Sequence, residues 1–73
     1  MTKYNIFKII ETALNLPSGT ITENSSRQDF IEWDSLGYVK ILAHLEQNSS
    51  KTIPDDLIFL SVIDILDFYE IKD

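Results

Sequence analysis

The sequence predicts a small all-α domain: a four-helix bundle with three longer helices, one short helix and a long first loop. Apolar residues recur with helical period near residues 3–16 and 35–48, and capping residues or a proline stand before each predicted helix. The chain has 73 residues and no cysteine, so a compact helical core is the usual way to stabilise it without disulfides. We expect one domain spanning residues 1–73.

The first helix is predicted from about Lys3 to Leu16. Thr2 is a suitable N-cap, and the turn residues Pro17 and Gly19 follow the last apolar position. The helical period places six apolar residues on one face, with polar residues opposite. The apolar set is Ile6, Phe7, Ile9, Ile10, Ala13 and Leu14, and the polar set is Asn5, Lys8, Glu11, Thr12 and Asn15.

Residues 17–33 carry no long period and are predicted to form a loop. Thr20 and Glu23 have the spacing of a capping box, which predicts a short helical turn there. Phe30, Ile31 and Trp33 are expected to anchor the loop to the core, because a long loop in so small a domain is usually functional or fixed to the core.

The second helix is predicted from Ser35 to about Asn48, capped by Asp34. Its apolar arc is wide, which predicts contacts with more than one neighbour. Ser35 lies at the edge of this arc, at the open end of the helix. The apolar residues are Leu36, Tyr38, Val39, Ile41, Leu42, Ala43 and Leu45, and the polar arc holds Gly37, Lys40, His44, Gln47 and Asn48.

Two further helices are predicted in the last third. Pro54 suits a first helical position and is followed by two acids, which predicts that a short helix starts within residues 53–57. Ser61 and Asp64 resemble a capping box at the start of the last helix. Its expected inward residues are Val62, Ile63, Ile65, Leu66, Phe68 and Tyr69, with Asp64, Asp67 and Glu70 toward solvent.

The charge balance limits the possible partners. The net charge is −6, and six of the twelve acids lie in residues 54–73, which hold one base. Such a surface repels nucleic acid and anionic lipid and attracts basic proteins. No apolar stretch is long enough to span a bilayer, and the N-terminus lacks a signal-peptide core, so we expect a cytoplasmic protein without membrane insertion. No metal site is predicted, because the adjacent pair Asp55 and Asp56 is more typical of a helix start.

Ser35 is the candidate functional residue, and it is poorly equipped to act as a nucleophile. A nucleophilic serine needs a base within hydrogen-bond reach. The only histidine, His44, lies nine residues further along the same helix, about 13.5 Å in rise and half a turn away. The G-x-S-x-G motif is also absent. The sequence therefore favours a modified serine over a catalytic one, with a simple helix start as the alternative.

The segment Asp34-Ser35-Leu36, followed by Val39, Leu42 and Leu45-Glu46, resembles the acyl carrier protein signature. The resemblance extends over nearly the whole length: an amphipathic first helix ending near a proline, a long first loop, Ile53-Pro54-Asp55, and Ser61-Val62 opening the last helix.

This resemblance implies a non-catalytic carrier. Ser35 would bear a covalent 4′-phosphopantetheine arm that holds acyl or aminoacyl groups as thioesters. Asp34 would also help to hold magnesium during arm transfer, and Gly37 would permit close approach of the arm or a partner. The implied partners of this monomer are a phosphopantetheinyl transferase, an acyl or aminoacyl ligase, and acyltransferase or synthase enzymes. The partner-binding residues would be Leu36, Val39, Lys40, Ala43, Asp55 and Asp56.

Two departures from the family pattern narrow this expectation. The second helix holds one acid, Glu46, whereas carriers of fatty-acid synthesis have a markedly acidic one. The D-S-L-G opening is more similar to specialised carriers, including those of surface-sugar modification, small polyketide-type pathways or D-alanine transfer. The short stretch from Pro54 to Ser61 leaves little room for a mobile third helix, so long acyl chains are not expected. A different class of function, an unmodified acidic interaction module with the same fold, remains an alternative.

Overall fold

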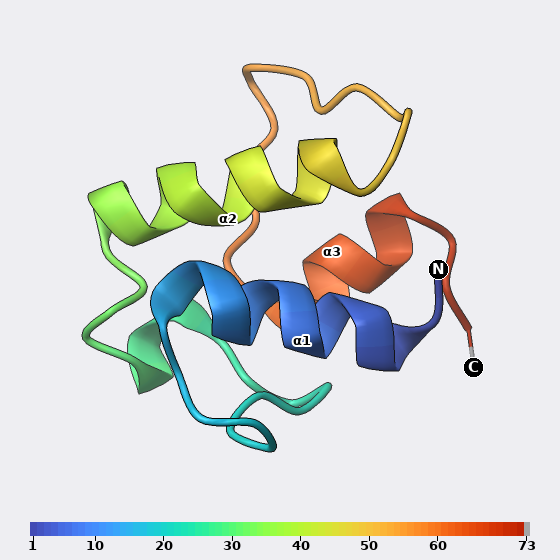
Figure 1. Cartoon of the computed structure of the whole chain (residues 1–73). Helices are drawn as coiled ribbons and strands as arrows, with labels where there is room; N and C mark the ends of the chain where they lie inside the picture. The colour runs from blue at the N-terminus through green and yellow to red at the C-terminus, as the bar shows by residue number, and fades with distance from the viewer. Residues whose placement is uncertain (73) are drawn as a thin grey trace.

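The computed structural model describes residues 1–72 and shows an all-α protein (Figure 1). Its described part contains three α-helices, one 3₁₀ turn and no strand beyond an isolated bridge between Ser26 and Ser61. Helix α1 packs against both α2 and α3, whereas α2 and α3 do not approach each other closely. The elements are α1 (Lys3–Leu14), η1 (Arg27–Asp29), α2 (Ser35–Gln47) and α3 (Val62–Phe68).

Helix α1 begins as the sequence predicts and ends two residues earlier. Thr2 and Asn5 form a capping box, and Asn15 ends the helix in the left-handed conformation with φ 58°. Phe7 is only partly buried. The other five residues of the predicted apolar face form its contribution to the core: Ile6, Ile9, Ile10, Ala13 and Leu14.

Glu11 corrects the predicted polar face of α1, because this acid is buried. Its Oε2 accepts hydrogen bonds from the backbone N–H of Gly19 at 3.0 Å and of Ile21 at 2.9 Å. The carboxylate is therefore a structural acceptor for the first loop, and it satisfies backbone groups that would otherwise lack partners.

The helical turn predicted at residues 20–23 does not form. Instead, the Thr20 hydroxyl donates to the Pro17 carbonyl at 2.6 Å and the Ile21 N–H donates to Glu11 at 2.9 Å, and these bonds hold the segment against the end of α1. The turn lies later, in η1, where the Asp29 carboxylate accepts from the Ser26 N–H at 2.9 Å.

The first loop is fixed to the segment before α3. The N–H of Arg27 donates to the Leu60 carbonyl at 2.9 Å, and the N–H of Val62 donates to the Ser25 carbonyl at 3.0 Å. Trp33 anchors the loop as predicted and is 1% exposed, whereas Ile31 is 93% exposed and anchors nothing. Phe30 packs against the core while partly exposed.

The short helix predicted to start within residues 53–57 is also absent. Asp55 and Asp56 form a turn, closed by a hydrogen bond from the Leu57 N–H to the Pro54 carbonyl at 3.1 Å. The chain then runs extended, because the Tyr38 hydroxyl donates to the Leu57 carbonyl at 3.3 Å and accepts from the Phe59 N–H at 3.0 Å. Figure 1 shows this connection arching over the end of α2.

Helix α3 begins at the predicted cap. Ser61 accepts from the Asp64 N–H at 3.2 Å, and the Asp64 carboxylate accepts from the Leu60 N–H at 2.9 Å. Ile63, predicted to face inward, is 45% exposed instead. The remaining apolar residues are buried or packed against the core, and the three acids Asp64, Asp67 and Glu70 are exposed as predicted.

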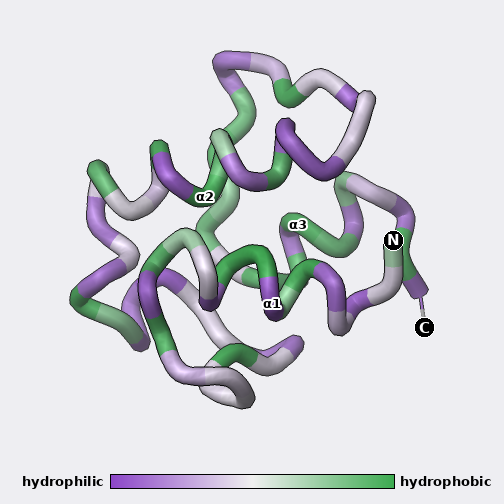
Figure 2. The backbone as a smooth tube through the Cα atoms, viewed as in Figure 1, coloured by the Kyte–Doolittle hydropathy of each residue, from purple (hydrophilic) through white to green (hydrophobic). Residues whose placement is uncertain are grey.

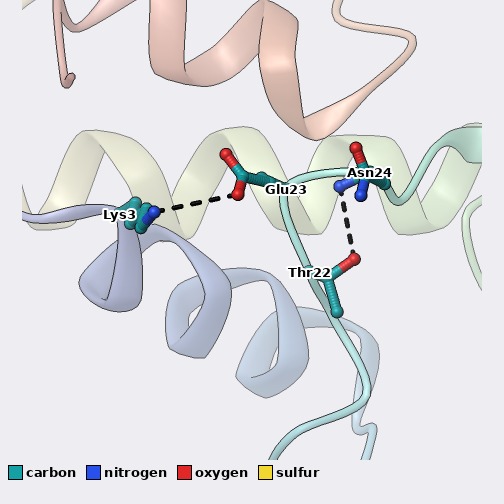
Figure 3. Close-up of polar contacts among 4 residues, drawn as sticks. All are labelled: Lys3, Thr22, Glu23 and Asn24. Atoms are coloured by element: carbon teal, nitrogen blue, oxygen red, sulfur yellow. Dashed lines mark hydrogen bonds and ion pairs between the residues drawn. The ribbon is translucent and has the colours of Figure 1, made fainter. Parts of the chain in front are cut away.

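The surface carries one ion pair among the described residues, between Lys3 and Glu23, whose charged atoms lie 3.8 Å apart (Figure 3). It links the start of α1 to the first loop, beside a hydrogen bond from the Asn24 N–H to the Thr22 hydroxyl. An exposed pair of this kind contributes little stability. Within residues 1–72, no helix has the length and apolar character needed to cross a membrane.

Candidate functional site at the start of α2

Ser35 is the first residue of α2, and its side chain is exposed. Asp34 caps the helix as predicted: its Oδ1 accepts from the Gly37 N–H at 2.8 Å. The first intrahelical bond runs from the Tyr38 N–H to the Asp34 carbonyl at 2.8 Å, so the N–H groups before Tyr38 have no intrahelical acceptor. These groups and the helix macrodipole favour negative charge beside Ser35.

His44 does not face Ser35. Its Nδ1–H donates to the Lys40 carbonyl at 2.8 Å, and the ring lines a separate hollow with α1 residues, among them Asn5 and Lys8. Within residues 1–72, no group of three or more His, Asp or Glu side chains is arranged to hold a metal ion. The histidine is therefore placed outside hydrogen-bond reach of the serine hydroxyl.

The predicted partner-binding residues of α2 form one exposed stripe. Leu36 is 65% exposed and Val39 is 59% exposed, and Lys40 and Ala43 complete the stripe at helical spacing. The sequence predicted that the whole apolar arc of α2 packs against neighbouring elements. Part of that arc does not, because Leu36, Val39 and Ala43 face solvent. Figure 2 shows apolar and polar stretches alternating along the α2 trace.

Asp55 and Asp56, the other predicted partner-binding residues, are both exposed. They lie in the α2–α3 connection, in the turn that replaces the predicted helix. The structure thus leaves both carboxylates accessible but does not place them on the same element as the α2 stripe.

Gly37 is buried, which corrects its predicted place on the polar arc. A Cβ atom added there would lie 1.9 Å from the Glu32 carbonyl oxygen and 2.9 Å from a Leu14 methyl carbon. The close approach that this glycine permits is therefore made by the protein's own first loop and α1. Gly37 thereby sets how closely Glu32 and Leu14 approach the start of α2.

An open hollow of about 700 Å³ beside Asp34 was not predicted from the sequence. Arg27, the only arginine of the chain, lines it, and its Nε–H donates to the Trp33 carbonyl at 3.1 Å. A lone arginine close before the serine in an acidic chain is the one signal that could have singled it out. The lining residues are Ser26, Arg27, Gln28, Phe30, Ile31, Trp33, Asp34 and Leu60.

Comparison of the chain with protein-family models, with curated proteins and with solved structures finds no match. The functional argument therefore rests on the residues of this chain and on their geometry.

Proposed function

We propose that the protein is a carrier that bears a 4′-phosphopantetheine arm on Ser35 and presents acyl or aminoacyl groups to partner enzymes as thioesters. The observation that carries the proposal is the exposed Ser35 hydroxyl on the first turn of α2, directly after the capping Asp34. The resemblance of residues 34–46 to the acyl carrier signature, in the same order of elements, gives this hydroxyl its assigned role.

A phosphodiester on Ser35 fits this end of the helix. The first-turn N–H groups and the positive end of the macrodipole stabilise a permanent negative charge by roughly 0.3–1 kcal/mol at an exposed position. The arm itself would supply the thiol that holds the cargo. Ser35 then contributes only its oxygen, and Asp34 contributes the cap and a carboxylate for magnesium during transfer.

The exposed stripe of Leu36, Val39, Lys40 and Ala43 supports recognition by partner enzymes. Exposed apolar side chains grouped around a modification site are typical of a docking surface. Lys40 and the single acid of α2, Glu46, suit partners that do not depend on a strongly basic patch. We expect the transferase, the ligase and the acyltransferase or synthase to approach along this stripe, in the cytoplasm.

We propose short acyl or aminoacyl cargo. The space between α2 and α3 is occupied by the extended chain around Phe59, which is 1% exposed and held by the Tyr38 hydroxyl at 3.0 Å. A long acyl chain entering there would have to displace a buried aromatic ring. A short group, including an amino acid such as D-alanine, makes no such demand.

Mass spectrometry tests the attachment. The purified protein is incubated with coenzyme A and a broad-specificity phosphopantetheinyl transferase, and the gain of one phosphopantetheine mass is expected. Ser35→Ala should abolish the gain. Ser18→Ala, which changes another exposed serine, should leave it intact. A wild-type protein that gains no mass, or a gain that survives Ser35→Ala, would contradict the proposal and favour the unmodified interaction module.

A further inference from the structure

The route between α2 and α3 is closed to an arm on Ser35, but the hollow beside Asp34 is open. The Tyr38 hydroxyl bonds both the Leu57 carbonyl and the Phe59 N–H, which fixes the connecting segment over that side of α2. The hollow beside Asp34 lies between the first loop and Leu60. Its walls are joined by the hydrogen bond from the Arg27 N–H to the Leu60 carbonyl at 2.9 Å.

Arg27 gives this hollow a positive charge in an acidic protein. Its Nε–H donates to the carbonyl of Trp33 at 3.1 Å. Trp33 is two residues before Ser35, so this bond fixes the orientation of the guanidinium relative to the start of α2. The one ion pair in the described chain involves Lys3 and Glu23, so Arg27 forms no salt bridge there. The planar guanidinium offers five N–H donors, and one of them suffices for the Trp33 carbonyl.

Trp33 forms part of the wall of the same hollow. Its side chain is 1% exposed and lines the hollow, and its indole Nε1–H is enclosed without a hydrogen-bond partner. Because Trp33 lines the hollow, its indole signal should respond to whatever occupies the hollow.

We infer that this hollow binds the proximal part of the arm, with Arg27 pairing with the phosphodiester and the apolar wall holding the branched unit that follows it. The inference rests on the proposed modification of Ser35 and adds where the arm lies. Arginine binds phosphate oxygens through charge-assisted hydrogen bonds. Phe30, Ile31 and Leu60 provide the apolar wall, and Ile31 and Leu60 are 93% and 55% exposed without the arm.

Placing the arm in this hollow explains why Ile31 is exposed in the bare protein. A large apolar side chain that anchors nothing in the bare protein would be covered by the methyl groups next to the arm's phosphate. Loop and arm would then bury apolar surface against each other, which favours the folded-back arm at roughly 25 cal/mol per Å² of apolar area removed from water.

Nuclear magnetic resonance tests the inference on the full chain before and after loading of Ser35. The chain has one tryptophan and one arginine, so the indole Nε1–H and the guanidinium Nε–H signals are each unique. Both signals should shift on loading, and the arm's methyl groups should give nuclear Overhauser contacts to Ile31 and Leu60. Arg27→Gln should reduce the shift of the Trp33 indole signal by more than half. Lys8→Gln, which removes an exposed charge on α1, should leave the shift intact.

The outcomes separate this inference from the proposed function. Loading seen by mass, with both unique signals unmoved, overturns the inference and leaves the carrier proposal standing. Contacts of the arm's methyl groups with Leu36 or Val39, in place of Ile31 and Leu60, also overturn the inference and leave the carrier proposal standing. Failure of Ser35 to load overturns both. Leu60→Ser keeps every backbone bond of the bridge and should weaken the methyl contacts, so the test does not depend on how well Arg27→Gln folds.

Discussion

Gly37 shows how one residue sets the distance between a loop and a helix. Glycine within a helix is less favourable than alanine by about 1 kcal/mol, so propensity alone favours its replacement. The packing opposes this, because the position of a Cβ atom is taken by the Glu32 carbonyl at 1.9 Å. The carbonyl belongs to the backbone just before the Asp34 cap, so it cannot move without moving the cap.

We predict that Gly37→Ala destabilises the protein in spite of its better helix propensity. Overpacking of this kind is destabilising by about 1–3 kcal/mol, which exceeds the gain in propensity. Urea denaturation followed by circular dichroism measures the free energy of unfolding. Gln47→Ala, at the exposed end of α2, is the control and should change it little. An unchanged or increased stability of Gly37→Ala would show that the loop does not press on α2.

Tyr69 is a second residue whose environment has a measurable consequence. Its hydroxyl is enclosed without a hydrogen-bond partner. Burial raises the pKa of Tyr69 above its usual value of 10.0; the polar Ser49 side chain nearby opposes this rise, and the negative charge of Glu46 adds to it. Between 10.0 and this higher pKa, the unfolded state loses the proton while the folded state keeps it. Stability from this group is therefore complete below pH 10.0 and declines as the pH rises toward the folded-state pKa.

We predict that Tyr69→Phe keeps or raises stability at neutral pH and reduces the decline above pH 10.0. The phenyl ring preserves the edge contact with Phe68, whose ring centre lies 4.9 Å away, and removes the unpaired hydroxyl. Urea denaturation at neutral pH and above pH 10.0 measures both effects. Tyr4→Phe, at a position 70% exposed, should keep the alkaline decline. An equal decline in Tyr69→Phe and in the wild-type protein would rule out this role of Tyr69.

At the scale of the elements, the starts of the three α-helices could be predicted from the sequence, whereas the structure of the loops could not. Thr2, Asp34 and Ser61 cap the three α-helices as predicted, because each cap depends on residues within one turn. The helical turns predicted near Thr20 and Pro54 are wrong. In both segments a side chain from elsewhere takes the backbone hydrogen bonds, Glu11 in the first and Tyr38 in the second. Such competition depends on tertiary contacts, which a local pattern does not reveal.

We predict that the two roles of Asp34 can be separated. Asp34→Ala removes the acceptor of the Gly37 N–H and should lower the free energy of unfolding by about 1 kcal/mol. Asp34→Asn keeps an acceptor oxygen at the cap and should retain most of that stability. If the carboxylate helps to hold magnesium, arm transfer to Ser35 should slow in both variants. Denaturation and the rate of mass gain measure the two effects, and an Asp34→Asn protein that loads at the wild-type rate would limit Asp34 to capping.

At the scale of the whole molecule, α1 is the element that holds the others together. It packs against α2 and α3, whose backbones do not approach each other closely, and through Glu11 it holds the first loop. The Ser35 and Asp34 end of the site could be predicted because these residues are adjacent in the sequence. The hollow could not, since it depends on the bridge between Ser26 and Ser61, which are far apart in the chain and join only in the fold.

The role of Glu11 leads to a prediction for the stability of the whole fold. Glu11→Ala leaves the N–H groups of Gly19 and Ile21 without their acceptor, and Ile21 is a core residue. We expect a loss of about 2 kcal/mol in the free energy of unfolding and faster amide hydrogen exchange at Ile21. Glu11→Gln keeps one oxygen that can accept from both N–H groups, as Oε2 does in the native protein. It should therefore lose clearly less unfolding free energy than Glu11→Ala.

Lys8→Ala is the matched control on the same helix, because its side chain is exposed. It should leave both the unfolding free energy and the exchange at Ile21 near their wild-type values. If Glu11→Ala unfolds no more easily than Lys8→Ala, the first loop does not depend on the buried carboxylate. The loop geometry that orients Arg27 and Trp33 would then have to be maintained by the bridge to Leu60 and by the burial of Trp33 alone.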